Sequence, residues 1–437
     1  EGAAAGTRPG VGGRGAAHGS TGTALDGGLQ KREPGRRGKL FCLPRDARQA
    51  LEISVQEDSE DVEVKPMGPD FGQVEGGKFT SATSATISRN LYCVPYGVDK
   101  VLEIDPMMGE MREIGGSVAM GDAKYTAAVA SPQYHGLLYA APCCAQKVLE
   151  INPHDGTVRE VGPKLGNKQM AKWWAIAASP GGRLYALPYD ASKVLEIDPT
   201  SGGKAKEVGP DLGTQRGKYR CVELAPNGNL YAAPLNASRV LEIDASGGIR
   251  LVGPNFGPRR MKYSCLVLAP NKLLYSPPLY ADRVLEINCA RGETREIGPV
   301  IGCSEAKYAC AAVASNGKVY APPLEARRVL EIDVLDHDAS EIGMDVGPGY
   351  EKYSCIAAAP VGGKLYAAPR EAHFVLEIDP LRLMVREVGP DLGRVERKFT
   401  CIVPGVVSEL AKPSKASAEG KTPVSPGLQT GPSISDV

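Results

Sequence analysis

LYALPYDASKVLEIDPTSGGKAKEVGPDLG, residues 184–213, recurs with small changes along most of the chain. Its VLEI core carries one Glu in each copy, and successive copies are 44 to 51 residues apart. A fixed period in the forties is typical of propellers and solenoids, so this repeat decides the fold. The repeated glutamates are Glu52, Glu103, Glu150, Glu196, Glu242, Glu286, Glu331 and Glu377.

Two further landmarks accompany each copy. One is an aromatic residue followed three positions later by Pro, as in Tyr185 and Pro188. The other is a Lys followed directly by an aromatic residue. These lysines are Lys78, Lys124, Lys172, Lys218, Lys262, Lys307, Lys352 and Lys398.

Each repeat contains four short apolar runs separated by turn residues, as in KYRCVELAPNGNLYAAPLNASRVLEIDASGGIRLVGP, residues 218–254. Short runs rich in Val, Ile, Leu and Tyr and divided by Pro-Asn-Gly or Asp-Pro-x-x-Gly predict β-strands in successive hairpins. The frequent Pro and Gly leave no room for the long amphipathic segments of helical repeats. Four strands in each repeat make one blade of a β-propeller.

The phase of the repeat predicts a closed ring. The first copy, from Lys39, lacks the strand that begins with the Lys-aromatic pair, whereas KFTCIVPG, residues 398–405, is such a strand with no blade after it. We therefore expect the C-terminal strand to complete the N-terminal blade, giving an all-β, eight-bladed propeller. Seven blades is the alternative, because the first copy is the most diverged.

The order of the four runs resembles propeller repeats of the NHL, YVTN and SMP-30 (gluconolactonase-like) kind. These begin with an inner strand, followed by a Gly-x-Leu-Tyr strand, an x-x-Val-x-x-Ile-Asp strand and a Gly-containing outer strand. The resemblance covers about 370 residues and implies the fold. It transfers no activity, because generic strand and turn positions carry it.

Composition predicts a soluble globular domain, residues 39–407, between two disordered tails. Residues 1–38 are rich in Gly, Ala and Arg, residues 408–437 are rich in Pro, Ser and Lys, and both contain few large apolar residues. The 51 basic residues balance 51 acidic ones, which gives no electrostatic reason to expect nucleic acid. We expect no transmembrane segment, because no apolar run is long enough to cross a membrane.

The repeated Glu is followed about nine residues later by a basic residue in most copies, across the Asp-Pro-x-x-Gly turn. This spacing places the two side chains opposite one another on the two outer strands of a blade. We expect structural ion pairs of about 0.2–1 kcal/mol each at the rim, rather than a functional ring of acids. The basic residues are Arg112, Arg159, Lys206, Arg250, Arg295 and Arg386, with Lys65 for Glu52 and Ser340 opposite Glu331.

The lysines of the Lys-aromatic pairs have a functional and a structural interpretation. As a ring at one mouth of the propeller, they could bind an anion, through Lys124, Lys172, Lys218, Lys262, Lys307 and Lys352. In the structural interpretation, which we favour, each Lys stem covers an aromatic ring while its ammonium pairs with an acid of a neighbouring blade, such as Glu160.

The cysteines and histidines suggest no catalytic or metal site. Five of the 11 cysteines share one inner-strand position that other repeats fill with Ser or Ala, which indicates a need for small size. The odd total of 11 cysteines favours reduced thiols and a reducing intracellular compartment. The five histidines share no repeat position, and no nucleophile or phosphate-loop motif is present, so we expect no cofactor.

Function in a repeat protein is expected where the repeats differ. The Pro-x-x-Ala loop carries a different pair of residues in each blade, and strand alternation places it on the face of the lysines. We predict that this face binds a protein partner and that the protein is a non-catalytic scaffold in a larger assembly. The alternative is an SMP-30-like, metal-dependent lactonase or hydrolase with its site at the propeller axis. The candidate contact residues are Tyr96, Tyr189, Asp190, Leu235, Leu279, Tyr280 and Leu324.

Overall fold

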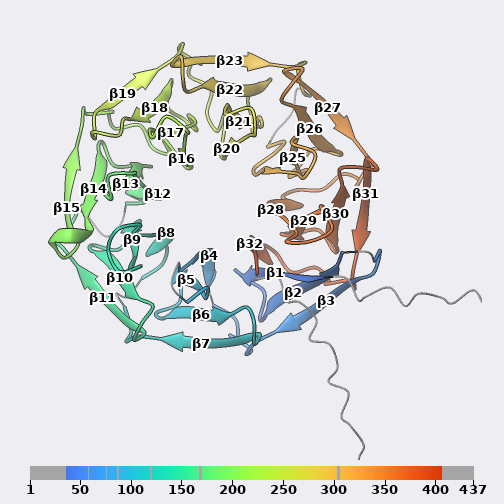
Figure 1. Cartoon of the computed structure of the whole chain (residues 1–437), viewed down its shortest axis with the longest axis horizontal. Coiled ribbons are helices and arrows are strands. Elements are labelled where there is room, and N and C mark those ends of the chain that lie inside the picture. Colours follow the sequence, from blue (N-terminus) through green and yellow to red (C-terminus); the bar gives the residue numbers. More distant parts are fainter. Residues whose placement is uncertain are drawn as a thin grey trace, which may run out of the picture. The chain divides into compact units, whose positions relative to one another are not determined.

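The structure, a computed structural model, describes residues 36–405 apart from 58, 75, 86–87, 119–120, 167–169 and 303–305. Eight four-stranded antiparallel sheets form a ring (Figure 1). The predicted all-β, eight-bladed propeller is thus confirmed, and the seven-bladed alternative is wrong. Most of the two predicted tails lies outside the described residues. The first strand begins at Arg37, slightly before the expected start at Lys39.

Each blade has its four strands in the order inner, second, third and outer. The inner strands are β4 (Phe79–Ser84), β8 (Tyr125–Ala130), β12 (Trp173–Ala178), β16 (Glu223–Leu224), β20 (Val267–Leu268), β24 (Ala312–Val313), β28 (Tyr353–Ala358) and β32 (Phe399–Pro404). The second strands are β1 (Arg37–Pro44), β5 (Leu91–Pro95), β9 (Leu138–Pro142), β13 (Leu184–Pro188), β17 (Leu230–Ala232), β21 (Leu274–Ser276), β25 (Val319–Ala321) and β29 (Leu365–Pro369).

The two remaining sets of strands lie further from the axis. The third strands are β2 (Ala50–Gln56), β6 (Val101–Asp105), β10 (Val148–Asn152), β14 (Val194–Asp198), β18 (Val240–Ile243), β22 (Val284–Asn288), β26 (Val329–Asp333) and β30 (Val375–Asp379). The outer strands are β3 (Val62–Met67), β7 (Glu110–Ile114), β11 (Thr157–Val161), β15 (Lys204–Val208), β19 (Ile249–Val252), β23 (Glu293–Ile297), β27 (Asp338–Ile342) and β31 (Met384–Val388).

We number the blades 1 to 8 in chain order, so that blade 1 contains β32 and β1–β3 and blade 8 contains β28–β31. The only helix among the described residues is a short 3-10 turn, Pro199–Ser201, between β14 and β15. No helix in this part of the chain is long and apolar enough to cross a membrane.

The second and third strands are apolar on both faces because each blade is covered by a blade on either side. All five residues of Leu184–Pro188 are buried, whereas the outer strand Lys204–Val208 is largely exposed. The hydrophobic core is therefore divided into clusters between blades. In one of them, Tyr92 and Val101 of blade 2 pack with Tyr125 and Leu149 of blade 3.

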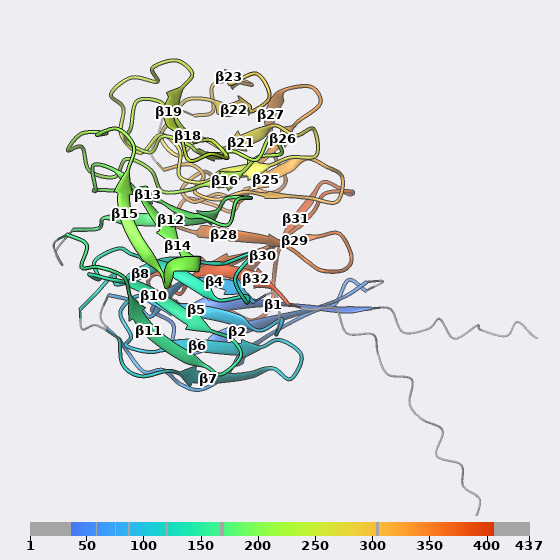
Figure 2. The ribbon, with the colours of Figure 1, turned by 60° about the vertical axis from the view of Figure 1, so that its left-hand side comes forward.

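Ring closure follows the prediction from the orphan C-terminal strand. β32 pairs antiparallel with β1, with Leu40 opposite Pro404 and Cys42 opposite Ile402. The first and last strands of the propeller therefore lie side by side in both views (Figure 1, Figure 2). Closing the ring within one sheet satisfies the edges of both terminal segments with main-chain hydrogen bonds.

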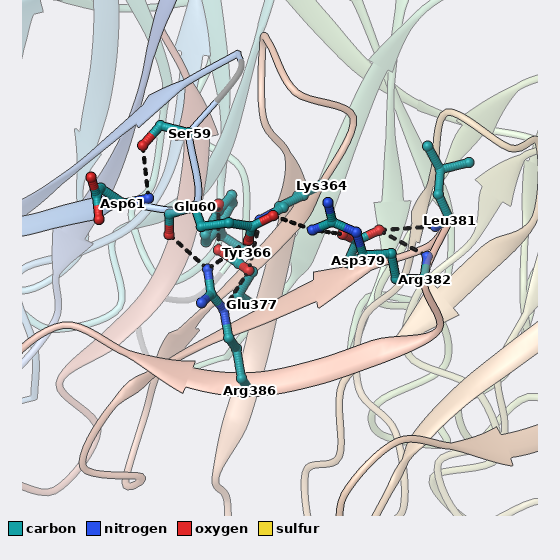
Figure 3. A network of polar contacts seen from close by, with 10 residues as sticks. All are labelled: Ser59, Glu60, Asp61, Lys364, Tyr366, Glu377, Asp379, Leu381, Arg382 and Arg386. Atoms are coloured by element: carbon teal, nitrogen blue, oxygen red, sulfur yellow. Dashed lines mark hydrogen bonds and ion pairs between the residues drawn. The ribbon is translucent and has the colours of Figure 1, made fainter.

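A polar latch fastens blade 1 to blade 8 at the outer edge (Figure 3). Glu60, in the turn between β2 and β3, accepts a hydrogen bond from Lys364 at 2.8 Å and pairs with Arg382. Arg386 donates to the main-chain oxygen of Glu60 at 2.8 Å and to the buried carboxylate of Glu377 at 2.7 Å. These cations hold the pKa of Glu60 well below its usual value, at about 2.

Candidate functional site

A closed circle of main-chain hydrogen bonds frames one mouth of the ring. In each blade the first loop residue after the Pro donates its N–H to the carbonyl of its own blade's Lys, as Tyr96 does to Lys78 at 3.0 Å. Its own carbonyl accepts the N–H of the next blade's Lys, as Tyr96 does from Lys124 at 3.0 Å. Two such bonds in each of eight blades give sixteen, all between 2.7 and 3.0 Å. We call this circle the annulus.

The annulus confirms that the Pro-x-x-Ala loops and the lysines share one face. It also fixes the loop residues, because each is held through both its N–H and its carbonyl group. The loop members of the annulus are Arg45, Tyr96, Cys143, Tyr189, Leu235, Leu279, Leu324 and Arg370.

The side chains of all eight repeated lysines are buried in the structure. Main-chain carbonyls accept hydrogen bonds from the ammonium groups of Lys78, Lys124, Lys172, Lys218, Lys262, Lys352 and Lys398. Lys124 donates to Gly121 at 2.8 Å and Lys218 to Gln215 at 2.6 Å. Burial lowers the pKa of Lys262 to about 8. The lysines of the candidate anion ring, Lys124, Lys172, Lys218, Lys262, Lys307 and Lys352, are all buried, which favours their structural interpretation.

Glu160, which was expected to pair with one of these lysines, accepts a hydrogen bond from a tyrosine instead, and so does Glu296 at the equivalent position of another blade. The carboxylate of Glu160 accepts the hydroxyl of Tyr125 at 3.3 Å, and that of Glu296 accepts the hydroxyl of Tyr263 at 2.9 Å. In both cases the Tyr and the Glu belong to the same blade, and the Glu lies on its outer strand. The structural interpretation of the lysines holds, but their partners are carbonyl groups.

The repeated Glu does form the predicted cross-strand pair. Glu242 lies opposite Arg250 in the β18–β19 register, at 2.7 Å. Its carboxylate also accepts Asn229 at 2.6 Å and the hydroxyl of Tyr231 at 3.0 Å. The side chain of Glu242 is only 1% exposed whereas that of Arg250 is 66% exposed, so this pair joins a buried carboxylate to a cation at the rim. In blade 7, where Ser340 faces Glu331, Lys318 supplies the cation at 2.7 Å.

A cavity of about 360 Å³ lies inside the annulus, at the axial mouth. The position directly after the Lys-aromatic pair contributes one lining residue from every blade, and the varied loop positions contribute most of the others. Its lining residues are Arg45, Thr80, Tyr96, Thr126, Trp174, Arg220, Met261, Ser264, Leu279, Tyr280, Ala306, Ala309, Leu324, Glu325, Glu351, Ser354, Arg370 and Thr400.

Three arginines converge on this axial pocket. Arg220 lies over the ring of Trp174 at 5.4 Å, and Arg45 lies over Tyr96 at 5.6 Å. Arg370 donates to Glu351 at 2.7 Å. Burial lowers the pKa of both Arg45 and Arg220, and the positive charge of Arg370 adds to the lowering. The pocket is therefore a place where positive charge is held in a partly desolvated space.

The predicted contact residues divide into two groups. Leu235, Leu279 and Leu324 are buried and pack together, so the expected exposed leucines are wrong. They form one apolar cluster with Ala306, between adjacent loops of the annulus. Tyr96, Tyr189 and Tyr280 are half-buried at the mouth, and Tyr189 packs on Trp174 with ring centres 4.9 Å apart.

Asp190 has a local structural role. Its carboxylate accepts the main-chain N–H of Gly217 at 2.9 Å, from the loop that leads into blade 5. This hydrogen bond links two adjacent loops of the mouth.

Sequence reasoning missed the most informative position, the residue that follows the Lys-aromatic pair. It is Thr80, Thr126, Trp174, Arg220, Ser264, Ala309, Ser354 and Thr400 in successive blades. The signal was available in the sequence. This position faces the axis in every blade, and one blade has Trp there and another has Arg, so the repeat varies where a ligand would enter.

Other features of the described residues are less suggestive of a site. No group of three His, Cys, Asp or Glu side chains in this part of the chain could hold a metal ion. The cysteines described here, which exclude Cys303, are all free. A second cavity, of about 580 Å³, lies beside Tyr350, His373 and Arg394 at the edge of blades 7 and 8. It is lined by only a few neighbouring segments, whereas every blade contributes to the axial pocket, so the axial pocket is the better candidate site.

These observations define a class: an eight-bladed β-propeller whose axial mouth is a polar pocket with three arginines. No family model matches the chain, and no curated protein matches it. Among solved structures, it is similar to a virginiamycin B lyase from Staphylococcus aureus, with a TM-score of 0.51 and 15% identity over 67% of this chain and 92% of that one. A protein from Lactobacillus plantarum matches with a TM-score of 0.51 and 12% identity, over 84% of this chain and 99% of that one.

A streptogramin B lyase matches with a TM-score of 0.50 and 13% identity, over 67% of this chain and 91% of that one. At these identities the likeness shows the fold alone. The resemblance to propeller repeats inferred from the sequence is thereby confirmed at the level of the fold.

Proposed function

We propose that the protein is a non-catalytic binding propeller that takes up a protein partner at the axial mouth and serves as a scaffold in a larger assembly. One observation carries this proposal. The positions that differ between repeats, including Tyr96, Trp174, Arg220 and Tyr280, gather around one pocket, whereas the repeated Lys and Glu are used inside the blades.

The chemistry of the mouth supports binding. Tyr, Trp and Arg dominate the energetics of protein interfaces because each offers a large contact area with a polar end. The annulus holds the loop residues in place before a partner arrives, which reduces the ordering cost of association. A partner inserted at this mouth would meet aromatic and guanidinium groups on a rigid frame.

A double variant, Tyr96→Ser with Tyr280→Ser, tests the proposal. Both rings line the pocket, and we expect the variant to lose the proteins that the wild type captures in a quantitative pull-down. Tyr350→Ser is the matched control, because Tyr350 is 71% exposed and lies away from the axis. If the double variant and the wild type capture the same proteins, and circular dichroism shows that both are folded, the proposal that this face binds a partner is refuted.

The enzymatic alternative, a metal-dependent lactonase or hydrolase, rests on Glu223. This inner-strand carboxyl is an acid whose pKa is raised by burial to about 7, which is a useful range for proton transfer. Metal analysis of the purified protein distinguishes the two functions. One tightly bound divalent ion per chain would favour the enzyme over the scaffold.

A further inference from the structure

We propose that the axial pocket is an anion site, in which Arg220 on one side of the ring and Arg45 and Arg370 on the other grip a carboxylate- or phosphate-bearing ligand. The inference rests on the proposed function only for the location of the site. It specifies the chemistry that the mouth recognises, which the partner proposal leaves open.

Arg220 is the central residue of this site. Among the described residues its side chain makes no hydrogen bond or ion pair, and its one specific contact is with the ring of Trp174. This cation–π contact holds the guanidinium beside the indole and uses none of its N–H donors, which remain able to bind an anion. Arg220 is partly buried and has no carboxylate partner among the described residues, so its guanidinium is available to a ligand that carries the opposite charge.

The remaining charges do not balance the arginines. Arg45, Arg220 and Arg370 line the pocket together with two carboxylates, Glu325 and Glu351. Glu351 is already engaged by Arg370 at 2.7 Å. The lining therefore carries an excess of positive charge, and an anion placed between the arginines would relieve their mutual repulsion.

The side of the pocket near Arg45 and Arg370 also offers hydrogen-bond donors. The Nε atoms of both arginines and the hydroxyls of Ser354 and Thr400 are buried without a hydrogen-bond partner in the part of the chain that the structure describes. These four residues belong to blades 1 and 8, which are adjacent in the ring, whereas Arg220 precedes β16 on the opposite side (Figure 1).

Hydroxyls elsewhere on the inner ring are already used. Thr126 donates to the carbonyl of Trp174 at 2.5 Å, and Ser264 donates to that of Ala309 at 2.9 Å. The unpaired donors are thus confined to one side of the pocket. A ligand there would find two guanidinium groups and two hydroxyls, a set suited to carboxylate or phosphate oxygens.

The pocket volume limits the ligand. A cavity of about 360 Å³ accepts a small organic polyanion or the acidic side chains of a short peptide segment. Both sources present the same oxygen chemistry to the arginines. The experiment therefore uses inorganic phosphate, citrate and a hexaglutamate peptide as separate probes.

Isothermal titration of the full chain with each probe, at low and at raised ionic strength, tests the site. We expect at least one probe to bind the wild type, with an affinity that falls as salt is added. Arg220→Gln should raise the dissociation constant about tenfold or more, since one charge-assisted hydrogen bond is lost. Arg220→Lys should recover part of the affinity because it restores the charge without the planar fork.

Arg291→Gln is the matched control, because Arg291 is 72% exposed on the turn between β22 and β23. It should bind the probe as the wild type does. If no probe binds the wild type at millimolar concentration, or if both Gln variants bind equally, the anion site is refuted. Loss of probe binding in Arg220→Gln supports it even if the tyrosine double variant still captures its partners, a result that would refute the partner face alone.

Discussion

The hydroxyl of Tyr231 provides a measurable test of how the repeated Glu contributes to stability. It donates to the carboxylate of Glu242 at 3.0 Å, and both side chains are almost completely buried. Burial alone would raise the pKa of Glu242, but hydrogen bonds from Arg250, Asn229 and Tyr231 outweigh it and lower the pKa. Tyr231→Phe removes one of these bonds and keeps the ring.

The expected cost is about 1.5 kcal/mol, at the low end of the range for a hydrogen bond to a charged group, because the other donors to Glu242 remain. Asn227, which donates to the Tyr231 hydroxyl, keeps a second bond to the carbonyl of Cys289 at 2.8 Å. For a propeller of about 370 residues the unfolding entropy is roughly 0.8 kcal/mol/K, so the melting temperature should fall by about 2 °C.

Differential scanning calorimetry and urea unfolding measure this change, with Tyr350→Phe as the exposed control. The loss should persist in 1 M NaCl, because salt screens exposed pairs far more than buried ones. A loss no larger than that of Tyr350→Phe, or one that disappears in salt, would refute the conclusion that the cluster is a buried polar element. Blade 1 offers a natural comparison, since Phe41 stands opposite Glu52 and the Ser54 hydroxyl donates to that carboxylate at 2.9 Å.

Two pH-dependent predictions follow from the latch and the buried lysines. Because the folded-state pKa of Glu60 is lowered to about 2, its stabilisation of ring closure is present above about pH 4.5 and is lost as the pH falls towards 2. Glu60→Gln should lower the melting temperature at neutral pH and should lose less stability than the wild type between about pH 4.5 and 2. An equal loss in the two proteins would contradict this role of Glu60. Burial lowers the pKa of Lys262 to about 8, so its unfolded form binds more protons between about pH 8 and 10.5. The stability of the wild type relative to Lys262→Met should rise across that interval in thermal melts, and an unchanged difference would show that Lys262 titrates normally.

The fold was predictable because its signals are periodic. The spacing of the VLEI cores gave the number of blades, and the orphan strand beginning at Lys398 gave the closure. The nine-residue separation of Glu103 and Arg112 gave their cross-strand register, because a hairpin turn of fixed length sets which residues face one another.

The environment of the repeated residues was less predictable. The sequence shows on which strand Glu242 or Lys124 lies, but not what the neighbouring blade places over it. Glu242 is buried because adjacent blades cover the third strand on both faces, and Lys124 is capped by carbonyl groups of a loop that carries no sequence signal. The buried leucines were misassigned for the same reason, since loop residues are normally exposed.

Arg220 was missed because repeat alignment directs attention to shared residues. The inner-strand position after the Lys-aromatic pair looks unimportant when only its small polar members are considered. Its functional interest appears only when the eight blades are arranged around one axis. Trp174 and Arg220, the two large residues at this position, then line the same pocket.

The annulus has a further consequence for the electric field at the mouth. Its bonds all run in the same rotational sense: each loop N–H donates within its own blade, and each Lys N–H donates to the preceding blade. Lys398 closes the circuit by donating to Arg370. A helix leaves unpaired groups at its ends and so develops a positive and a negative pole. A closed circuit has no ends, so its peptide dipoles cancel around the ring. The preference of the mouth for one sign of charge is therefore set by a few side chains, and exchanging those side chains should reverse it without altering the frame.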